Sequence, residues 1–298
     1  MISERSAYKF FFWDDPMKFN IFRRFWPRRF WTVLAAAALL HDFSGMAQAV
    51  PLPEQTTLEQ TLQQPPQTVQ VVEPHLTTRE RQTRVDYRGW PAERVLDAVL
   101  GREWRTAGLE VEFRARDGYV SRIPAERFTQ YRAYLVFERI GQPAFTIDNP
   151  AQNQQNVPLG PYYLVWDNIQ APELVAEGGT YWPYQVTQIQ VSAARLEALL
   201  PRPLAERYAS VAAEAQKYCL SCHQINGFGG EKWPGNLAQQ AKSLQDNDLL
   251  RWMLEPSRVK PGTTMPPLPE GLPPAERDAL ARRLLEYLKA VPVAIPSV

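Results

Sequence analysis

The sequence predicts a multidomain protein in which a small α+β domain is followed by an all-α domain. Two observations lead to this prediction. Residues 82–200 contain short apolar runs typical of strands, whereas residues 204–292 have the pattern of helices separated by Gly- and Pro-rich loops. The chain has 298 residues, of which 45% are hydrophobic, so it is long enough for two folded domains and a leader.

Residues 1–49 have the pattern of a secretory signal peptide. The apolar stretch 31–40 follows the basic cluster Arg23–Arg29, and Ala47-Gln48-Ala49 provides small residues at the cleavage spacing. A membrane anchor is the alternative, but this apolar run is shorter than the roughly 20 residues needed to span a bilayer. We therefore expect a periplasmic protein without a transmembrane span after cleavage, or a membrane-associated one if the leader is retained.

The charge distribution argues against nucleic acid as a partner. The formal net charge is +1, and seven of the 33 Lys and Arg residues lie before residue 30. The remaining sequence contains no run of Lys or Arg of the kind that forms a phosphate-binding face.

Residues 50–80 are expected to form a flexible tether. The stretch is rich in Pro, Gln and Thr, as in Gln63-Gln64-Pro65-Pro66-Gln67, and has few large apolar residues to bury. An additional edge strand formed by Val69, Val71 and Val72 is the alternative for its central part.

Residues 82–200 are expected to fold as the α+β domain. Pro91 is typical of a helix start, and apolar residues between 95 and 100 then share one face. Residues 109–113 alternate between apolar and polar, and Asp117-Gly118 is a hairpin signal. Further strands are expected at 134–137, 162–166 and 186–191.

The region 204–292 is expected to be helical. Helices are predicted at 204–218, 246–254 and 274–289, with the cysteine motif and a Gly-rich loop after the first of them. In the last helix Leu280, Leu284, Leu285 and Leu288 form one apolar stripe.

The motif Cys219-Leu220-Ser221-Cys222-His223 contains both cysteines of the chain. On a helical turn, positions i, i+3 and i+4 project from the same face, so two thiols and an imidazole lie together. Each thiol can form a thioether bond with a haem vinyl group, and His223 can reach the iron beside them. This spacing is the attachment signature of c-type haem, and it predicts one covalently bound haem c.

Three other interpretations of the cysteines are weaker. A redox dithiol belongs in a thioredoxin-like βαβ setting, whereas this motif follows a helix and precedes a Gly-rich loop. A structural zinc ion needs four ligands, and apart from this motif the exported part offers only the distant His75. A disulfide that closes so short a loop would restrict the unfolded chain very little.

A six-coordinate haem iron needs a second axial ligand, and two methionines are available. Met265 lies in the Pro-bounded loop Thr263-Thr264-Met265-Pro266-Pro267, which can hold a thioether against the iron. Met253 lies among Leu249, Leu250 and Trp252, as a core methionine does. His223 and Met265 are therefore the predicted axial ligands.

Four further residues are predicted to support the haem. The carbonyl of Pro234 is a candidate acceptor for the second ring nitrogen of His223, a bond that would orient the imidazole. Trp233, Arg258 and Lys260 flank the two loops and could hydrogen-bond the haem propionates. Solvated surface positions are the equal alternative for the two basic residues.

Residues 204–291 resemble the small class I cytochromes c, in which His and Met ligate a single haem. This resemblance implies an all-α class I cytochrome c domain with one haem edge exposed for electron exchange. The Gly and the aromatic residue often found before the first Cys in that family are Val211 and Ala215 here, so the packing of the first and last helices is open to question. The residues that carry the resemblance are Cys219, Cys222, His223, Pro234, Met265 and Tyr287.

Residues 117–191 show a weak, partial similarity to the sulfite-oxidase-type molybdopterin-binding fold, mainly around Gly160-Pro161-Tyr162-Tyr163 and Trp182 to Val191. In that family a cysteine binds molybdenum, and both cysteines here are assigned to haem. We therefore expect no active molybdenum centre. The many aromatic residues of this region form either a docking patch or a β core.

Together, these observations predict an exported monohaem c-type cytochrome that transfers single electrons, as a shuttle or as a subunit of a periplasmic oxidoreductase. Its partners would be redox proteins such as an exported dehydrogenase or a terminal oxidase, and it would be a carrier rather than a catalyst by itself. A haem enzyme or gas sensor with an open sixth iron position is the alternative. An assembly factor is a third interpretation.

Overall fold

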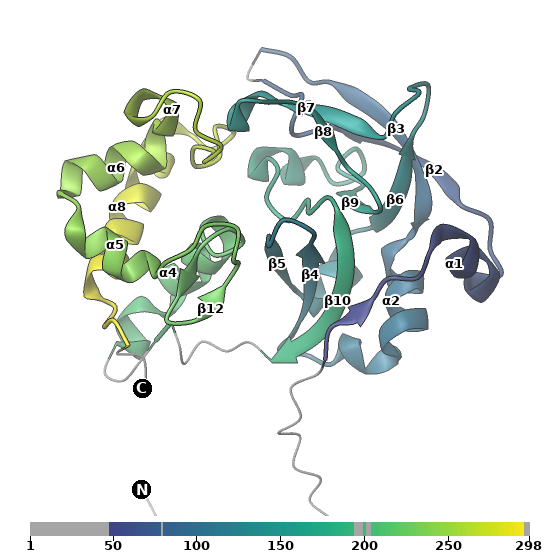
Figure 1. Ribbon diagram of the computed structural model, residues 1–298, viewed down its shortest axis with the longest axis horizontal. Coiled ribbons are helices and arrows are strands. Elements are labelled where there is room, and N and C mark those ends of the chain that lie inside the picture. Colours follow the sequence, from purple (N-terminus) through teal and green to yellow (C-terminus); the bar gives the residue numbers. More distant parts are fainter. Residues whose placement is uncertain (1–47, 79, 194–198, 201–203, 295–298) are drawn as a thin grey trace, which may run out of the picture. The chain divides into compact units, whose positions relative to one another are not determined.

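The protein is described by a computed structural model that covers residues 48–78, 80–193, 199–200 and 204–294 (Figure 1). It is a mixed fold that combines helices with several antiparallel sheets. The prediction of an all-α class I cytochrome c domain is wrong, because the cysteine motif leads directly into an antiparallel pair, β11 (Gln224–Ile225) and β12 (Phe228–Gly229). Each of these strands has two residues, which is too short for a period of two to appear in the sequence.

Two four-stranded antiparallel sheets form the first part of the described chain. Their strand orders are β1-β10-β4-β5 and β2-β3-β6-β9, and a separate pair is formed by β7 and β8. The hairpin predicted at Asp117-Gly118 is confirmed, because β4 and β5 pair across it with Val111 opposite Ile123. The strands are β1 (Val50–Pro51), β2 (Gln67–Val72), β3 (Arg84–Pro91), β4 (Leu109–Ala115), β5 (Val120–Pro124), β6 (Ala133–Arg139), β7 (Thr146–Asn149), β8 (Gln154–Pro158), β9 (Tyr163–Trp166) and β10 (Val186–Ala193).

Helices pack beside these sheets as the apolar pattern predicted. Pro91 precedes α2, and Val95 and Leu96 of that helix are buried. The helical segments of this part are α1 (Gln55–Leu62), α2 (Ala92–Leu100) and α3 (Ala125–Gln130), with short 3-10 helices η1 (Arg102–Arg105), η2 (Pro150–Gln152) and η3 (Pro172–Glu177).

The stretch 50–80 is folded in its described residues, so the prediction of a flexible tether is wrong for them. Leu58 of α1 and Val71 of β2 are fully buried, and β2 pairs with β3 over its whole length. The alternative was correct, since β2 is an edge strand of its sheet. Apart from the exposed Val50, the Leu and Val residues of the stretch are buried or half-buried, so composition underestimated their contribution.

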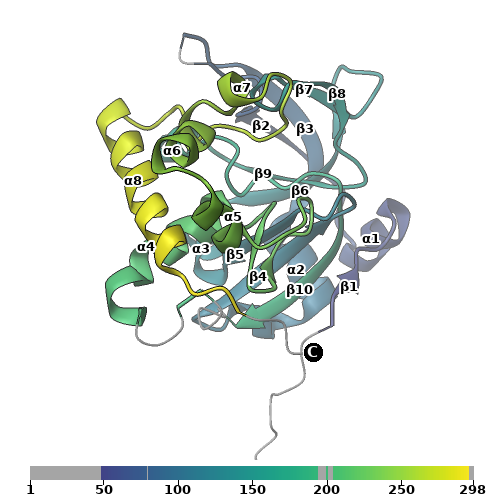
Figure 2. The ribbon, with the colours of Figure 1, turned by 60° about the vertical axis from the view of Figure 1, so that its left-hand side comes forward.

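The helical part of the chain has the three predicted helices at nearly the predicted positions. Leu280, Leu284 and Leu288 form the buried stripe of α8, and α8 packs against α4, α5 and α6 (Figures 1 and 2). The helices are α4 (Ala205–Tyr218), α5 (Leu237–Ser243), α6 (Asp246–Leu254), α7 (Pro256–Val259) and α8 (Pro274–Ala290).

The sheets and the helices have separate hydrophobic cores, and a polar contact joins them. Arg122 on β5 bonds Glu112 on β4 at 3.2 Å, and the same guanidinium lies over the ring of Phe228 at 4.3 Å. Gln216 on α4 donates a hydrogen bond to the buried Glu110 on β4. Burial raises the pKa of Glu110, although the bond from Gln216 and the charge of Arg122 partly oppose this.

Replacing Glu110 with glutamine should stabilise the protein at neutral pH. Because its pKa is raised, Glu110 binds a proton more readily in the folded state than in the unfolded chain. The stability that Glu110 contributes is therefore fully present below the unfolded pKa and is lost as the pH rises through the folded pKa. The glutamine amide carries no titratable group, so this loss does not occur in the variant. Its N–H also supplies a hydrogen-bond donor for the unpartnered Oε1 of Gln216, and that bond should contribute about 1 kcal/mol to stability. Urea unfolding of Glu110→Gln and the wild type, measured between acidic and neutral pH, checks this.

Glu126→Gln is the matched control for this prediction. The backbone N–H of Gly108 donates to Glu126 and lowers its pKa, so its contribution is present above the unfolded pKa and is lost as the pH falls through the folded pKa. This variant should therefore lose stability at neutral pH. The prediction fails if Glu110→Gln gains no stability relative to the wild type as the pH is raised.

The predicted signal peptide, residues 1–49, lies almost entirely outside the described residues. None of the helices in the described residues is both long enough and apolar enough to cross a membrane.

Candidate functional site

The cysteine motif forms one helical turn directly after α4. The backbone N–H of Cys219 donates to the carbonyl of Ala215 at 2.9 Å, so the helix ends on the first cysteine. The N–H of His223 then donates to the carbonyl of Cys219 at 3.0 Å, which is the i to i+4 bond of an α-turn. The predicted helical turn over the motif is therefore present.

Two glycines allow the following hairpin to fold back onto this turn. The N–H of Gly230 donates to the carbonyls of Leu220 and His223, at 2.8 and 2.9 Å. A Cβ on Gly230 would lie 2.1 Å from the carbonyl oxygen of Ser221, and one on Gly229 would lie 2.1 Å from that of His223. Only glycine permits so close an approach of two backbones.

The β4–β5 hairpin holds the turn from the other side. The N–H of Val120 donates to the carbonyl of Ser221 at 2.9 Å, and the N–H of Glu231 donates to the carbonyl of Gly118 at 2.9 Å. Lys232 and Asp117 form an ion pair of 2.7 Å beside these bonds. The turn is therefore built jointly by two parts of the chain that lie about 100 residues apart.

Both cysteines are unpaired and half-buried. Burial raises the pKa of Cys219 to about 12, with a smaller contribution from Cys222, and burial raises the pKa of Cys222 to about 11. Dithiol oxidoreductases lower the pKa of the attacking thiol, whereas these thiols are protonated at neutral pH. The electrostatics of the turn therefore disfavour the redox-dithiol interpretation.

The imidazole of His223 has an unused ring nitrogen. Its Nδ1 is buried and has no hydrogen-bond partner among the residues that the structure describes. Burial lowers the pKa of His223, which favours the neutral imidazole that a metal ion binds. Two unpaired thiols and an imidazole whose Nδ1 is free among the described residues are the donor groups that covalent haem attachment requires, so these residues fit that cofactor.

The two methionines differ as the sequence pattern indicated. Met253 on α6 is only 4% exposed and lies in the helical core. Met265 is half-buried in the segment between α7 and α8, where its N–H donates a hydrogen bond to the hydroxyl oxygen of Thr263 at 3.2 Å. The carbonyl of Thr263 in turn accepts a bond from Asn153 at 2.6 Å, which ties this loop to η2 and β8.

The four supporting residues have different surroundings. The N–H of Trp233 donates to the carbonyl of Cys222 at 3.0 Å, and its side chain is 42% exposed. The carbonyl of Pro234 accepts a bond from Gln240 at 3.3 Å, and the predicted bond from His223 is not seen in the described residues. Arg258 is exposed and pairs with Glu255, and Lys260 is exposed, so neither is placed by the structure in a haem-binding role.

Sequence reasoning missed a small polar cavity beside the turn. It has a volume of about 40 Å³, and Lys232, Tyr119, Tyr184 and His75 are among the side chains that line it. Burial raises the pKa of the Tyr119 hydroxyl, and the nearby Ser221 of the motif partly opposes this. Burial by itself lowers the pKa of Lys232, but the bond to Asp117 and the nearby Tyr184, Asp117 and Cys222 groups together outweigh it, so the pKa is raised. The sequence feature that could have indicated this cavity is Lys232, which lies shortly after the motif.

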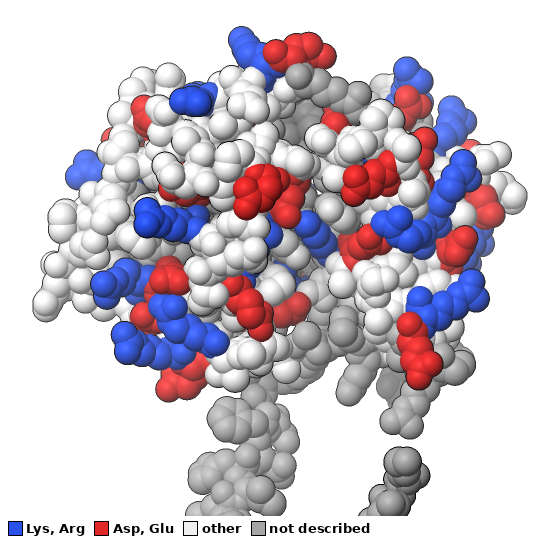
Figure 3. Space-filling view, turned by 180° about the vertical axis from the view of Figure 1, so that it is seen from behind, with Lys and Arg blue, Asp and Glu red and all other residues white. Residues whose placement is uncertain are grey.

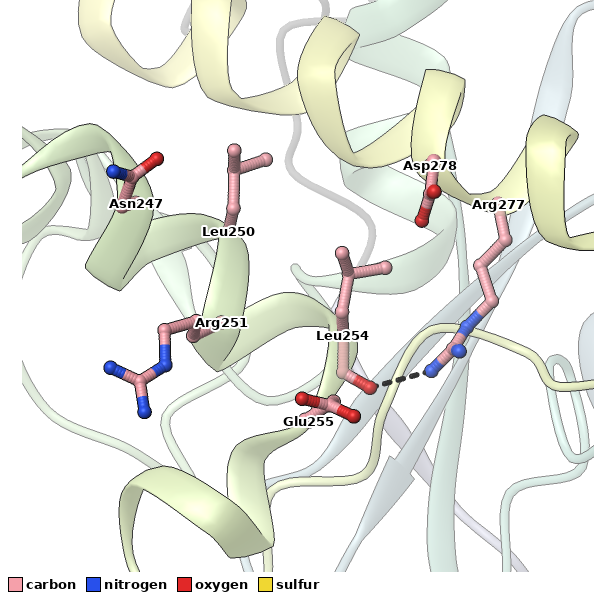
Figure 4. Close-up of a pocket in the computed structure, with 7 residues that line it drawn as sticks. All are labelled: Asn247, Leu250, Arg251, Leu254, Glu255, Arg277 and Asp278. Atoms are coloured by element: carbon pink, nitrogen blue, oxygen red, sulfur yellow. Dashed lines mark hydrogen bonds between the residues drawn. The ribbon is translucent and has the colours of Figure 1, made fainter.

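A second, open depression lies between α6 and α8 (Figure 4). Arg277 crosses it and donates to the carbonyl of Leu254 at 2.6 Å, while Asp278 and Arg251 lie at its sides. None of the predicted site residues lines it. On the face shown in Figure 3, basic and acidic side chains are interspersed, and neither kind gathers into a patch.

Comparisons with known proteins were made for the whole chain. No protein-family model matches it, and no curated protein matches it either.

Proposed function

We propose that this protein is an exported c-type cytochrome that carries one covalently bound haem and transfers single electrons to and from redox proteins. The observation that supports the proposal is the turn Cys219–His223, which contains two unpaired thiols and an imidazole whose Nδ1 has no hydrogen-bond partner among the described residues. When bound, haem would supply an iron that alternates between Fe(II) and Fe(III). In this proposal Cys219 and Cys222 hold the cofactor, and His223 and Met265 are the axial ligands.

The surroundings of the turn suit an electron carrier. The bonds from Gly230 and Val120 hold the turn on two sides, so the attached ligands have little freedom to move. A rigid site changes its geometry little when the charge on the cofactor changes, which is what rapid electron exchange needs. Trp233 lies next to Cys222 in space and is 42% exposed, so an aromatic side chain is available at the surface for contact with a partner.

The basic test is the spectrum and mass of the mature protein from its native host. We expect Soret absorption that stays with the polypeptide after denaturation, and a mass that exceeds the polypeptide by one haem. A bare polypeptide mass without Soret absorption would refute the proposal.

Replacing Met265 with leucine should change the haem spectrum and lower the midpoint potential. Leucine has a similar size but lacks the sulfur, and a thioether ligand raises the potential. The expected drop is on the order of 0.1 V or more. Optical redox titration of Met265→Leu measures it, and Met253→Leu is the matched control because Met253 lies in the core. An unchanged spectrum in Met265→Leu would show that another group, or no protein group, occupies the sixth position.

A further inference from the structure

The loop that contains Met265 is folded around Thr263, which is only 8% exposed. The N–H of Met265 donates to the hydroxyl oxygen of Thr263 at 3.2 Å, and the N–H of Thr263 donates to the carbonyl of Lys260 at 3.1 Å. These bonds join residues two and three positions apart. They give the loop its local shape, but they do not fix its place relative to the rest of the molecule.

Asn153 supplies a contact that does fix the place of this loop. Its amide nitrogen donates to the carbonyl of Thr263 at 2.6 Å and to the hydroxyl of Ser257 on α7 at 3.2 Å. An amide nitrogen carries two hydrogens, so both bonds can form at the same time. Figures 1 and 2 both show α7 and the β7–β8 pair at the same end of the described chain.

The position of Asn153 is itself fixed by the sheets. Its φ of 52° lies in the left-handed region, which asparagine adopts more readily than most residues do, and its N–H donates to the carbonyl of Pro150 at 3.0 Å. The β7–β8 pair that it joins places Ile147 and Val157 in the hydrophobic core of the sheets. The Met265 loop is therefore fastened to that core through one side chain.

The cysteine turn is fastened to the same core. Val120 begins β5 and donates its N–H to the carbonyl of Ser221 inside the turn. The β4–β5 hairpin places Phe113 and Ile123 in the core to which Ile147 and Val157 also belong. Both segments that contain a predicted iron ligand, His223 and Met265, are thus held by one body of sheets in addition to the helices around them.

We propose that the sheet region (β1 to β10) is a clamp that holds the two axial ligands of the haem site, and that Asn153 is the residue that positions Met265. The inference rests on the proposed function, because it takes Met265 as an iron ligand. A neutral thioether competes with other ligands only while the chain around it keeps it in place, since a preorganised ligand loses less freedom on binding. The clamp would therefore keep the sixth iron position closed to external ligands.

The first experiment measures how easily an added ligand displaces Met265. Imidazole is titrated into the oxidised full-length holoprotein, and its binding is followed by loss of the far-red absorption band that a methionine sulfur gives with Fe(III). The apparent affinity of imidazole rises with the fraction of protein in which Met265 has left the iron. Asn153→Gly removes the amide and keeps a residue suited to the left-handed turn, so it should raise this affinity about fivefold, the effect of about one hydrogen bond.

Two further variants separate the role of the amide from that of the turn. Asn153→Asp keeps the shape of the side chain but has no N–H to donate, so it should raise the imidazole affinity as Asn153→Gly does. Asn156→Gly is the matched control. Asn156 is an exposed residue of the same hairpin with φ 50°, and its backbone bond to Asp148 at 2.8 Å is kept in the variant, so its imidazole affinity should equal that of the wild type.

Asn153 is exposed, so these variants should fold, and urea unfolding of each verifies this. Wild-type imidazole affinity in Asn153→Asp, combined with a raised affinity in Asn153→Gly, would show that the turn rather than the amide matters and would overturn the proposal. An affinity that is unchanged in both variants would also overturn it.

A second measurement tests the clamp without using the iron. Hydrogen exchange of the Met265 N–H, followed by nuclear magnetic resonance, should be about fivefold faster in Asn153→Gly, whereas exchange of the Met253 N–H within α6 should not change. Equal exchange of the Met265 N–H in the variant and the wild type would overturn the proposal.

The outcomes distinguish this inference from the proposed function. A holoprotein with Soret absorption and the far-red band, but with the same imidazole affinity in the wild type and both Asn153 variants, would overturn the inference while the proposed function stands. A holoprotein without the far-red band would overturn Met265 as a ligand and the inference with it, and covalent haem attachment would stand. Absence of Soret absorption would overturn both.

Discussion

Replacing Cys219 and Cys222 together with serine is expected to remove all covalently bound haem. Serine has nearly the same shape as cysteine, but its hydroxyl forms no thioether bond with a haem vinyl group. The half-buried positions accept this change without a new cavity, so the polypeptide should still fold. Extraction with acidified acetone, followed by mass spectrometry, should find haem only in the solvent for the variant and only on the polypeptide for the wild type.

Ser221→Ala is the matched control for this experiment. Ser221 lies between the two cysteines, and its backbone carbonyl, which accepts the bond from Val120, is kept in the variant. Haem should remain attached. If the double serine variant retained covalent haem, the attachment site would lie elsewhere and the interpretation of the turn would be wrong.

Replacing Gly230 with alanine is expected to destabilise the protein by about 3 kcal/mol and to lower the yield of haem-loaded protein. The added Cβ would lie 2.1 Å from the carbonyl oxygen and 2.7 Å from the carbonyl carbon of Ser221. Both atoms belong to the backbone, so the contact can be relieved only by moving the hairpin away from the motif. Urea unfolding followed by tryptophan fluorescence measures the loss.

Gly227→Ala separates this effect from ordinary glycine strain. Gly227 has φ +83° and nothing within 4 Å of its ideal Cβ, so alanine there costs only the strain of a left-handed residue, about 1 kcal/mol. Equal losses in the two variants would mean that the close contact between Gly230 and the motif has no special importance.

The elements that could be predicted are those with a local signal. The apolar stripe of α8, the proline before α2 and the Asp117-Gly118 turn between β4 and β5 each depend on residues within a few positions, and all three were located correctly. The strands β11 and β12 have no such signal, because a two-residue strand is defined only by its partner. Residues 50–80 were misjudged for a related reason, since composition says how many apolar residues there are but not where they are buried.

Only part of the surroundings of the site was accessible from the sequence. Local spacing gave no indication that Val120 bonds Ser221 of the motif or that Gly118 bonds the following Glu231, because backbone hydrogen bonds require no particular side chain. Glu73 was counted as part of a polar tether, whereas it is a buried acceptor for two tyrosines, one of them 90 positions away.

By itself, the sequence determined that two thiols and one imidazole share a turn, because positions i, i+3 and i+4 are related by local helical geometry. The tertiary structure decided that the N–H of Val120 in the β4–β5 hairpin bonds the carbonyl of Ser221 in that turn, and that Asn153 bonds Thr263 in the Met265 loop, 110 positions away. The physical reason is that these contacts join residues far apart in the chain, and their partners are selected only when the hydrophobic cores bring the strands and helices together.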